Sequence, residues 1–548
     1  MSTDLLITDA VVVDGTGAPG RAADVAVTGD RIVAITPVGT GEWARRVIRA
    51  DGRVLAPGFV DLHAHSDVRI LVDHDHLAKV SQGVTCEVLG QDGLSYAPTD
   101  ETTAPLLRRQ LAGWNGDPEL ALGWPRVADY LNALDGGIAC HAAYLVPQGT
   151  VRMLVIGHDD RPATAVERAR MAEVVRQGLL DGAVGLSSGL TYPPGMYADT
   201  DELVALCDVV AEHGGFYAPH HRSYGAGALV AYAEMIMIAR RSGCALHLTH
   251  ATLNFRVNAG RSGELLTMID AALADGIDVT LDTYPYLAGS TSLVALLPRW
   301  ATAGGPDVIM DRLADASARA RIAYALEVEG SEGCHGCPVD WSTIEISGVG
   351  DPALSGAVGR TIAQLAGHTG SAPIDAYADL LLRDRLAPTI LQHVGNEENV
   401  RAIMQHPVHT GGSDAILVGD KPHPRAWGTF PRYLGHYVRE LGVLGLEDCI
   451  HHLTGRAAAR LRLVDRGLVR VGHHADLVLF DPDRVRDVAT YADPRQQAEG
   501  IDWVLVNGEP VIEEAARTEA LPGRALRRTA TGARAHDRYH RGSQHRGR

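Results

Sequence analysis

Between residues 57 and 455, short apolar segments typical of strands alternate with segments typical of helices, and this pattern limits the possible folds most. Eight strands are expected, at 58–65, 84–90, 137–146, 183–190, 214–221, 245–250, 277–286 and 408–414. Strands that alternate with helices form parallel sheets. Eight of them predict an α/β protein built on a (β/α)8 TIM-like barrel.

Side chains that can bind a metal gather toward the carboxyl ends of these strands, where barrel enzymes carry their catalytic residues. They are His63, His65, Cys86, His220, His250 and Asp414. Taken singly, each has an ordinary structural explanation: a buried cysteine, a polar strand end or a turn aspartate. Together, thiolate, imidazole and carboxylate are the ligands that zinc prefers. The pattern therefore predicts a catalytic metal centre at the barrel mouth.

The rest of the chain is expected to form further parts around the barrel of residues 57–455. Short strands at 1–56 and 456–524 predict one small β-sandwich built from both chain termini. The stretch at about 295–405 is too long for a simple connection and is interpreted as an insertion. Residues 525–548, rich in Arg, Gly and His, are expected to form a disordered tail, with RNA or partner binding as the alternative.

Composition limits the partners and the compartment. The net charge of −17 argues against nucleic acid or an anionic membrane as a partner. No apolar run approaches the ~20 residues that a membrane span needs, and the N-terminus lacks the features of a signal peptide. Seven scattered cysteines predict free thiols in a reducing cytoplasm. The CHGC stretch, Cys334–Cys337, is interpreted as a loop with two free thiols rather than half a zinc site or a redox pair. The oligomeric state stays open.

Several stretches, in order along the chain, resemble the amidohydrolase superfamily and, within it, the D-aminoacylases (N-acyl-D-amino-acid deacylases). They are GFVDLHAHSD, GVTCEVLGQDG, GLTYPPGMYADTDEL, YAPHHR, LHLTH, DTYPYLAGSTSL, GGSDA and HPRAWGTFPRYLGHY. The resemblance implies a zinc-dependent hydrolase that removes the acyl group from an N-acyl-D-amino acid or a related small-molecule N-acyl compound. It extends over nearly the whole chain.

The resemblance also implies a ligand set. The tight zinc would be held by Cys86, His220 and His250, and a second, weaker site sharing Cys86 would be formed by His63, His65 and Asp414. Many amidohydrolases bridge two metals with a carboxylated lysine, whereas D-aminoacylases use a cysteine on the second strand. The only lysines here, Lys79 and Lys421, do not lie at expected strand ends.

Substrate contacts follow from the same resemblance, with one departure. Tyr192, Tyr284 and Ser290 are expected to line the substrate pocket, and Arg222 is expected to bind the substrate carboxylate. D-aminoacylases usually carry a carboxylate-binding lysine two residues after the last zinc histidine, where this chain has Thr252.

The expected reaction is hydrolysis by a zinc-activated water, with Asp414 as general base and then general acid. Two alternatives stay open: a cyclic amidase of the hydantoinase type, and a non-catalytic scaffold that keeps the barrel. The cysteine and the absent lysine count against the first, and the complete set of six candidate ligands counts against the second.

Overall fold

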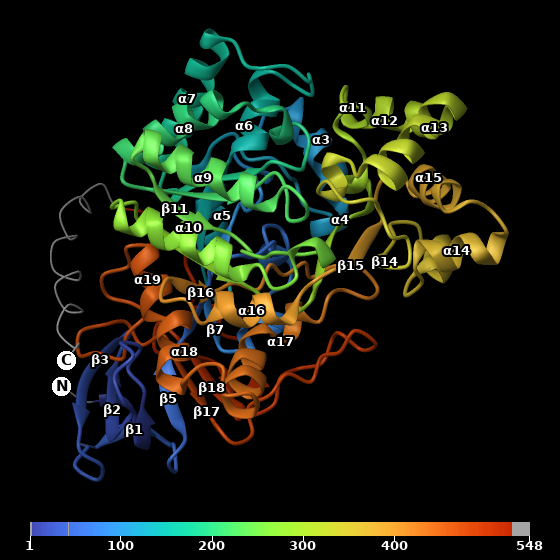
Figure 1. Ribbon diagram of the computed structural model, residues 1–548. Coiled ribbons are helices and arrows are strands. Elements are labelled where there is room, and N and C mark those ends of the chain that lie inside the picture. Colours follow the sequence, from blue (N-terminus) through green and yellow to red (C-terminus); the bar gives the residue numbers. More distant parts are fainter. Residues whose placement is uncertain (1–2, 42, 529–548) are drawn as a thin grey trace.

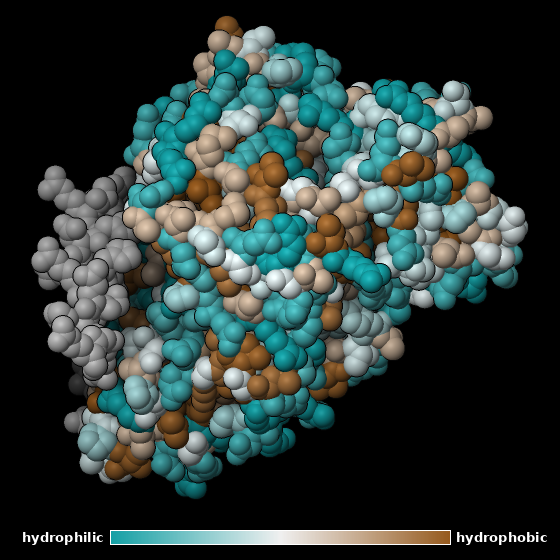
Figure 2. All heavy atoms as spheres, viewed as in Figure 1, coloured by the Kyte–Doolittle hydropathy of each residue, from teal (hydrophilic) through white to brown (hydrophobic). Residues whose placement is uncertain are grey.

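The structure is a computed structural model that describes residues 3–41 and 43–528. Figure 1 shows a central barrel, a β-domain beside it that contains the first strands of the chain, and a helical lobe that projects from the opposite side. The face in view is mostly hydrophilic, with scattered hydrophobic patches (Figure 2). Among the described residues, no helix is both long and apolar enough to span a membrane.

The eight predicted barrel strands are confirmed. They are β6 (Phe59–Asp61), β7 (Val84–Leu89), β8 (His141–Pro147), β9 (Gly185–Gly189), β10 (Phe216–His220), β11 (Ala245–Leu248), β12 (Val279–Thr283) and β16 (His409–Gly411). They pair in parallel in this order, so that each strand lies beside the next one along the barrel. Between β16 and β6 the circle is closed by single hydrogen bonds, including Leu62 N–H to the Gly411 carbonyl at 3.3 Å.

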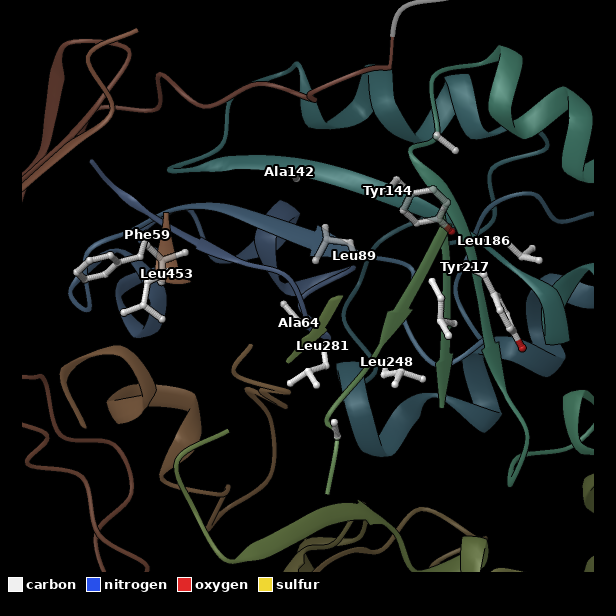
Figure 3. Close-up of a cluster of buried hydrophobic side chains, with 14 of the residues drawn as sticks. Phe59, Ala64, Leu89, Ala142, Tyr144, Leu186, Tyr217, Leu248, Leu281 and Leu453 are labelled. Carbon is white, nitrogen blue, oxygen red and sulfur yellow. The ribbon is translucent and has the colours of Figure 1, made fainter. Parts of the chain in front are cut away.

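Helices cover the outside of the barrel, because its strands are buried on both faces and must pack against another layer. The barrel and its mouth carry α1 (Arg69–Val72), α2 (Leu77–Val80), α3 (Thr103–Gln110), α4 (Ala112–Asn115), α5 (Val127–Leu134), α6 (Gln148–Val155), α7 (Ala165–Leu180), α8 (Thr200–Glu212), α9 (Ala228–Ser242), α10 (Ser262–Ala274), α16 (Glu397–Met404), α17 (Arg425–Arg432), α18 (Leu446–Leu453) and α19 (Gly455–Arg460). Buried side chains such as Leu89, Leu186 and Leu281 belong to the core shared by strands and helices (Figure 3).

The β-domain is built from both ends of the chain, as predicted. Its strands are β1 (Thr3–Val12), β2 (Arg21–Thr28), β3 (Arg31–Thr36), β4 (Ala44–Arg49) and β5 (Val54–Pro57), followed by β17 (Leu477–Phe480), β18 (Ile501–Val506), β19 (Glu509–Glu513) and β20 (Ala516–Arg517). All nine belong to one hydrogen-bonded sheet, in which β5 pairs with both β1 and β17. The N-terminal and C-terminal segments of the chain therefore stabilise each other by forming one sheet.

The helical lobe corresponds to the predicted insertion, with different boundaries. It contains a three-stranded sheet of β13 (Ala288–Ser292), β15 (Thr389–His393) and β14 (Ile344–Gly348), and the helices α11 (Arg299–Thr302), α12 (Pro306–Ala314), α13 (Ala316–Tyr324), α14 (Ile362–Thr369) and α15 (Pro373–Arg383). Its buried side chains form a separate hydrophobic cluster. Helix α16, which we expected inside the insertion, contacts α10 and β12 and belongs to the barrel.

The predicted tail begins too early. Leu526 N–H donates to the Ala142 carbonyl at 2.8 Å, and Arg528 N–H donates to the Gly182 carbonyl at 3.0 Å. Residues 525–528 therefore pack against the barrel, because their backbone groups find partners on β8 and on the turn before β9. The remainder of the expected tail, 529–548, lies outside the described residues.

Candidate metal centre

Six buried side chains meet at the carboxyl end of the barrel and form two overlapping groups of possible metal ligands. The first group is His63, His65, Asp92 and Asp414, and the second is Asp92, His220 and His250. Within each group the ligand atoms lie within 4.8 Å of one another. Five of the six residues were predicted as ligands from the sequence, and the sixth, Asp92, is common to both groups.

Asp92 occupies the centre of this arrangement. One carboxylate oxygen, Oδ1, lies 3.6 Å from His63 Nε2 and 3.5 Å from His250 Nε2. The other, Oδ2, lies 3.7 Å from His65 Nε2 and 3.3 Å from His220 Nδ1. A carboxylate between two histidine pairs can contribute an oxygen to each of two metal ions.

Several polar atoms of the centre are buried without a hydrogen-bond partner. Both ring nitrogens of His63 and Oδ1 of Asp92 make no hydrogen bond. Buried polar groups without partners are costly, and a bound ion satisfies them. Imidazole and carboxylate are also ligands that zinc accepts, so the residues fit a zinc centre.

Charge–charge interactions fix the protonation of these groups. Burial opposes ionisation of the Asp92 and Asp414 carboxyls, but neighbouring charges outweigh it. The pKa of Asp92 is held below its usual range by His220 and His250. The pKa of Asp414 is likewise held below its usual range by Arg425 and His63. Both carboxylates are therefore ionised and available as ligands at neutral pH.

Three residues of the centre have a positive φ angle, a backbone conformation that residues other than glycine rarely adopt. The φ angles are +53° at Asp92, +30° at His250 and +50° at Asp414. Such strain persists only where the surroundings enforce it. The His250 N–H donates to Asp282 Oδ1 at 2.9 Å, and the Asp414 N–H donates to the His63 carbonyl at 2.8 Å. The backbone thus holds these side chains toward the barrel axis at a local energetic cost.

A buried ion pair fixes the seam between the first and last barrel strands. Asp61 Oδ1 accepts the backbone N–H of Ser413 at 2.8 Å and that of His63 at 3.2 Å. The Lys79 ammonium donates to Asp61 Oδ2 at 2.6 Å and to Ser413 Oγ at 2.8 Å, and lies 2.8 Å from Glu87 Oε1. All four side chains of Lys79, Asp61, Glu87 and Ser413 are buried. Lys79 therefore supports, through Asp61, the backbone of the ligand His63 and of Ser413, the neighbour of the ligand Asp414, and is not itself one of the grouped ligands.

Cys86, expected as a ligand from the sequence, is not placed among the candidate ligands by the structure. Cys86 lies inside β7, in register with Val60 and His141, six residues before Asp92. Its thiol belongs to an apolar cluster of the barrel interior with Val88 and Leu145, and burial raises its pKa above the usual range. Its Sγ is in neither of the two groups of ligand atoms that meet at the carboxyl end of the barrel. The carboxylate of Asp92, beyond the end of the same strand, takes the place expected for Cys86.

The substrate pocket opens directly onto the centre. Its lining includes the predicted residues Tyr192, Tyr284 and Ser290, and also Thr252. Arg222 is not among the lining residues. Its Nε donates to Glu234 Oε2 at 2.9 Å, and its Nη2 donates to the Ala198 carbonyl at 2.7 Å. The structure thus places Arg222, expected as a carboxylate anchor, outside the pocket lining and engages its donors with other groups.

Arg425, which the sequence analysis missed, is not itself a lining residue, but it places a positive charge against three residues that are, Asp414, Tyr284 and Ser290. This arginine is fully buried; its Nη2 lies 2.9 Å from Asp414 Oδ2, and its guanidinium lies 4.5 Å from the ring centroid of Tyr284. Its Nε and Nη1 have no hydrogen-bond partner. The signal was present, because Arg425 belongs to the HPRAWGTFPRYLGHY stretch that carries the family resemblance.

The CHGC stretch also contributes to the pocket. Cys334 is buried, Cys337 is half-buried, and both are free thiols. Between them, His335 lines the pocket and packs edge-on against Tyr224. Burial, with His220 and His250 nearby, lowers the pKa of His335 to about 3, so this imidazole is neutral at physiological pH.

Comparison with known proteins agrees with this architecture. The model of the amidohydrolase family matches residues 46–512. The chain is 36% identical to a D-aminoacylase of Alcaligenes xylosoxydans xylosoxydans, over 96% of this chain and 98% of that one. It is likewise 36% identical to an N-acyl-D-aspartate deacylase of the same organism, over 95% of each chain.

A solved structure shares the fold over almost the full length. The N-acyl-D-glutamate deacylase of Bordetella bronchiseptica, in complex with zinc and a phosphonate inhibitor that mimics the tetrahedral intermediate, superposes with a TM-score of 0.82. The two chains are 32% identical, and the match covers 96% of this chain and 100% of that one. With its barrel, its terminal β-domain and this extent of similarity, the chain belongs to the amidohydrolase family.

Proposed function

We propose that this protein is a zinc-dependent deacylase that hydrolyses the amide bond of N-acyl-D-amino acids, a small-molecule substrate class. The observation that carries the proposal is the position of Asp92 between the two histidine pairs, with Asp414 beside them. The names of the three relatives support this substrate class: a D-aminoacylase, an N-acyl-D-aspartate deacylase and an N-acyl-D-glutamate deacylase.

In this proposal Asp92 replaces Cys86 in the ligand set. His220, His250 and Asp92 would hold the tight zinc, and His63, His65 and Asp414 would form a second, weaker position together with Asp92. Zinc in this centre would polarise the amide carbonyl and lower the pKa of a bound water from about 15.7 toward 7. An oxygen and nitrogen ligand set without sulfur fits this ion and is compatible with an open position for substrate.

Asp414 is proposed as the group that moves the proton. Arg425 and His63 keep its carboxyl ionised, so it can accept a proton from the attacking water at neutral pH. The same carboxyl then delivers that proton to the leaving nitrogen as the amide bond breaks. Proton transfer by a positioned side chain contributes about 10²–10⁴-fold to the rate.

Arg425 is proposed as the anchor of the substrate's carboxylate. Two of its N–H groups, at Nε and Nη1, are buried without partners, and a carboxylate is the group that a guanidinium binds best. Tyr284, whose ring lies under the guanidinium, and Ser290, whose carbonyl lies 3.4 Å from Arg425 Nη2, define the same side of the pocket. Tyr192 lies across the pocket and packs against His220.

The cytoplasm is proposed as the compartment. All seven cysteines are free thiols, which supports a reducing environment.

The test combines metal analysis with a hydrolysis assay on N-acetyl-D- and N-acetyl-L-amino acids, monitored by release of the free amine. We expect bound zinc and turnover of the D-enantiomers, both lost after dialysis against a chelator and restored by zinc. Equal turnover of both enantiomers would contradict the substrate class, and full activity in the metal-free protein would contradict the mechanism.

A further inference from the structure

A second cavity adjoins the metal pocket on the side of β9. It lies between α3 and α4 of the barrel mouth and α11 and α12 of the helical lobe, which face each other in Figure 1. The ion pair between Arg109 and Asp307, 2.7 Å long, joins α3 to α12 across its outer rim. The two cavities have four lining residues in common, Trp114, Thr191, Tyr192 and Ala295, so these residues form the boundary between the second cavity and the pocket at the metal centre.

The lining of this second cavity is mainly apolar. Beside the shared residues, Leu94, Leu111, Val294, Pro306, Ile309 and Leu386 contribute apolar side chains, and the polar residues of the lining are Arg109, Gln110, His158, Ser292 and Thr302. The volume that the centre of a water-sized atom can occupy is about 50 Å³. Since one water needs about 10–15 Å³ of such volume, the cavity has room for about four non-hydrogen atoms.

The order of the barrel strands decides which part of the substrate reaches this cavity. Arg425 and Tyr284 follow β16 and β12, whereas Tyr192 follows β9, which is four strands away from β16 around the eight-stranded barrel. The two sides of the pocket therefore lie across the barrel axis from each other. When the carboxylate of the amino acid binds at Arg425, the acyl group on the other side of the scissile bond points toward β9.

The Trp114 indole, which lies at the boundary between the two cavities, carries a hydrogen-bond donor without a partner. Trp114 is buried, its Nε1 has no hydrogen-bond partner, and its ring contacts both His65 and Tyr192, with ring centroids 4.9 and 5.0 Å apart. The boundary between the two cavities thus contains two aromatic rings that lie directly beside the metal centre.

We propose that this cavity binds the acyl chain of the substrate, and that the protein acts on N-acyl-D-amino acids whose acyl group is longer than acetyl. With room for about four atoms beyond the acetyl methyl, hexanoyl is the best fit. This inference rests on the proposed deacylase function and specifies the half of the substrate that is released as a carboxylic acid.

The experiment compares kcat/KM for the N-acetyl, N-butanoyl, N-hexanoyl and N-decanoyl derivatives of one D-amino acid, using the zinc-loaded protein. Each buried methylene can raise kcat/KM by up to about fourfold, so we expect at least a tenfold rise from acetyl to hexanoyl and no further rise to decanoyl. A flat or falling series in a protein that hydrolyses the acetyl substrate would overturn the acyl cavity and leave the deacylase function standing. No hydrolysis of any member would overturn both.

Variants locate the effect. Val294 lines the second cavity but not the metal pocket, so Val294→Phe should reduce the ratio of hexanoyl to acetyl kcat/KM at least about tenfold. The matched control is Val230→Phe on the surface of α9, where valine is 77% exposed and the ratio should not change. If Val294→Phe does not fold, Val294→Ala enlarges the cavity and should shift the preference toward decanoyl. An unchanged ratio in the folded Val294 variant would overturn the proposal.

Discussion

Replacing Lys79 by methionine tests how the seam under the metal centre is stabilised. The ammonium contacts Asp61, Glu87 and Ser413 at 2.6–2.8 Å, and every one of these side chains is buried. Methionine fills a similar volume but leaves the Asp61 and Glu87 carboxylates without their shared cation. Removing one partner of a buried ion pair costs about 3–5 kcal/mol, a large part of a typical unfolding free energy of about 5–15 kcal/mol.

The assay is urea-induced unfolding followed by circular dichroism, with Lys421→Met as the matched control. Lys421, the other lysine of the chain, pairs with Glu345 at 2.5 Å, and its side chain is 24% exposed. A pair that solvent screens in this way contributes about 1 kcal/mol or less. We therefore expect the loss in Lys79→Met to exceed that in Lys421→Met by at least about 2 kcal/mol.

The dependence on pH gives this prediction a second, independent readout. Burial opposes ionisation of Glu87, but Lys79 and His76 lower its pKa to about 2. A carboxyl with a lowered pKa stabilises the fold above the pKa of the unfolded chain, and this stability is lost as the pH falls toward 2. Without Lys79 the pKa of Glu87 rises, and protonation relieves the unpaired charge. The difference between the wild-type protein and Lys79→Met should therefore shrink below about pH 4.5. Equal losses in the two lysine variants, or a difference independent of pH, would refute the reasoning.

Three further predictions concern turnover and substrate binding. Asp414→Asn should fold normally but lose about 10²–10⁴-fold in kcat, because an amide cannot accept the proton of the attacking water; a near-normal kcat would show that another group is the base. Arg425→Met should raise KM for N-acyl-D-amino acids about ten- to a hundredfold without raising KM for neutral N-acyl amines, and any loss of kcat through its partner Asp414 should be common to both substrates, while the control Arg222→Met leaves both KM values unchanged; an equal effect on both KM values would exclude a carboxylate anchor. Thr252→Lys adds a cation to the pocket wall and should lower KM for N-acyl-D-amino acids about tenfold, and an unchanged KM would place the carboxylate elsewhere.

The barrel could be predicted from the sequence because short, largely apolar strand segments alternate regularly with helical segments. β7 (VTCEVL) and β8 (HAAYLVP) are buried along their whole length, as expected for strands covered on both faces. The β-domain could be predicted from the alternating pattern at both ends of the chain. The boundaries of the insertion could not be predicted, because helix α16 has the same local pattern whether it packs on the lobe or on the barrel.

The ligand set was harder to predict because it depends on where each strand ends. Cys86 and Asp92 both follow the start of β7, which ends at Leu89. Because of this strand end, the Cys86 thiol lies within the strand and the core, whereas the Asp92 carboxylate lies beyond it at the barrel mouth. The difference between the expected and the observed position of Arg222 has a similar origin. Arg222 lies two residues after His220, a spacing that gives the same side-chain direction only while the strand continues, and β10 ends at His220. Spacing within a motif is thus informative inside a strand and misleading beyond it.

The identity of the shared ligand is the central claim, and metal content measured by mass spectrometry after exhaustive dialysis tests it most directly. The account predicts that Asp92→Ala loses the tightly bound zinc, because this carboxylate lies between both histidine pairs. It predicts that Cys86→Ala keeps the zinc content of the wild-type protein, because its thiol is part of an apolar cluster. Loss of zinc from Cys86→Ala together with full retention in Asp92→Ala would contradict it.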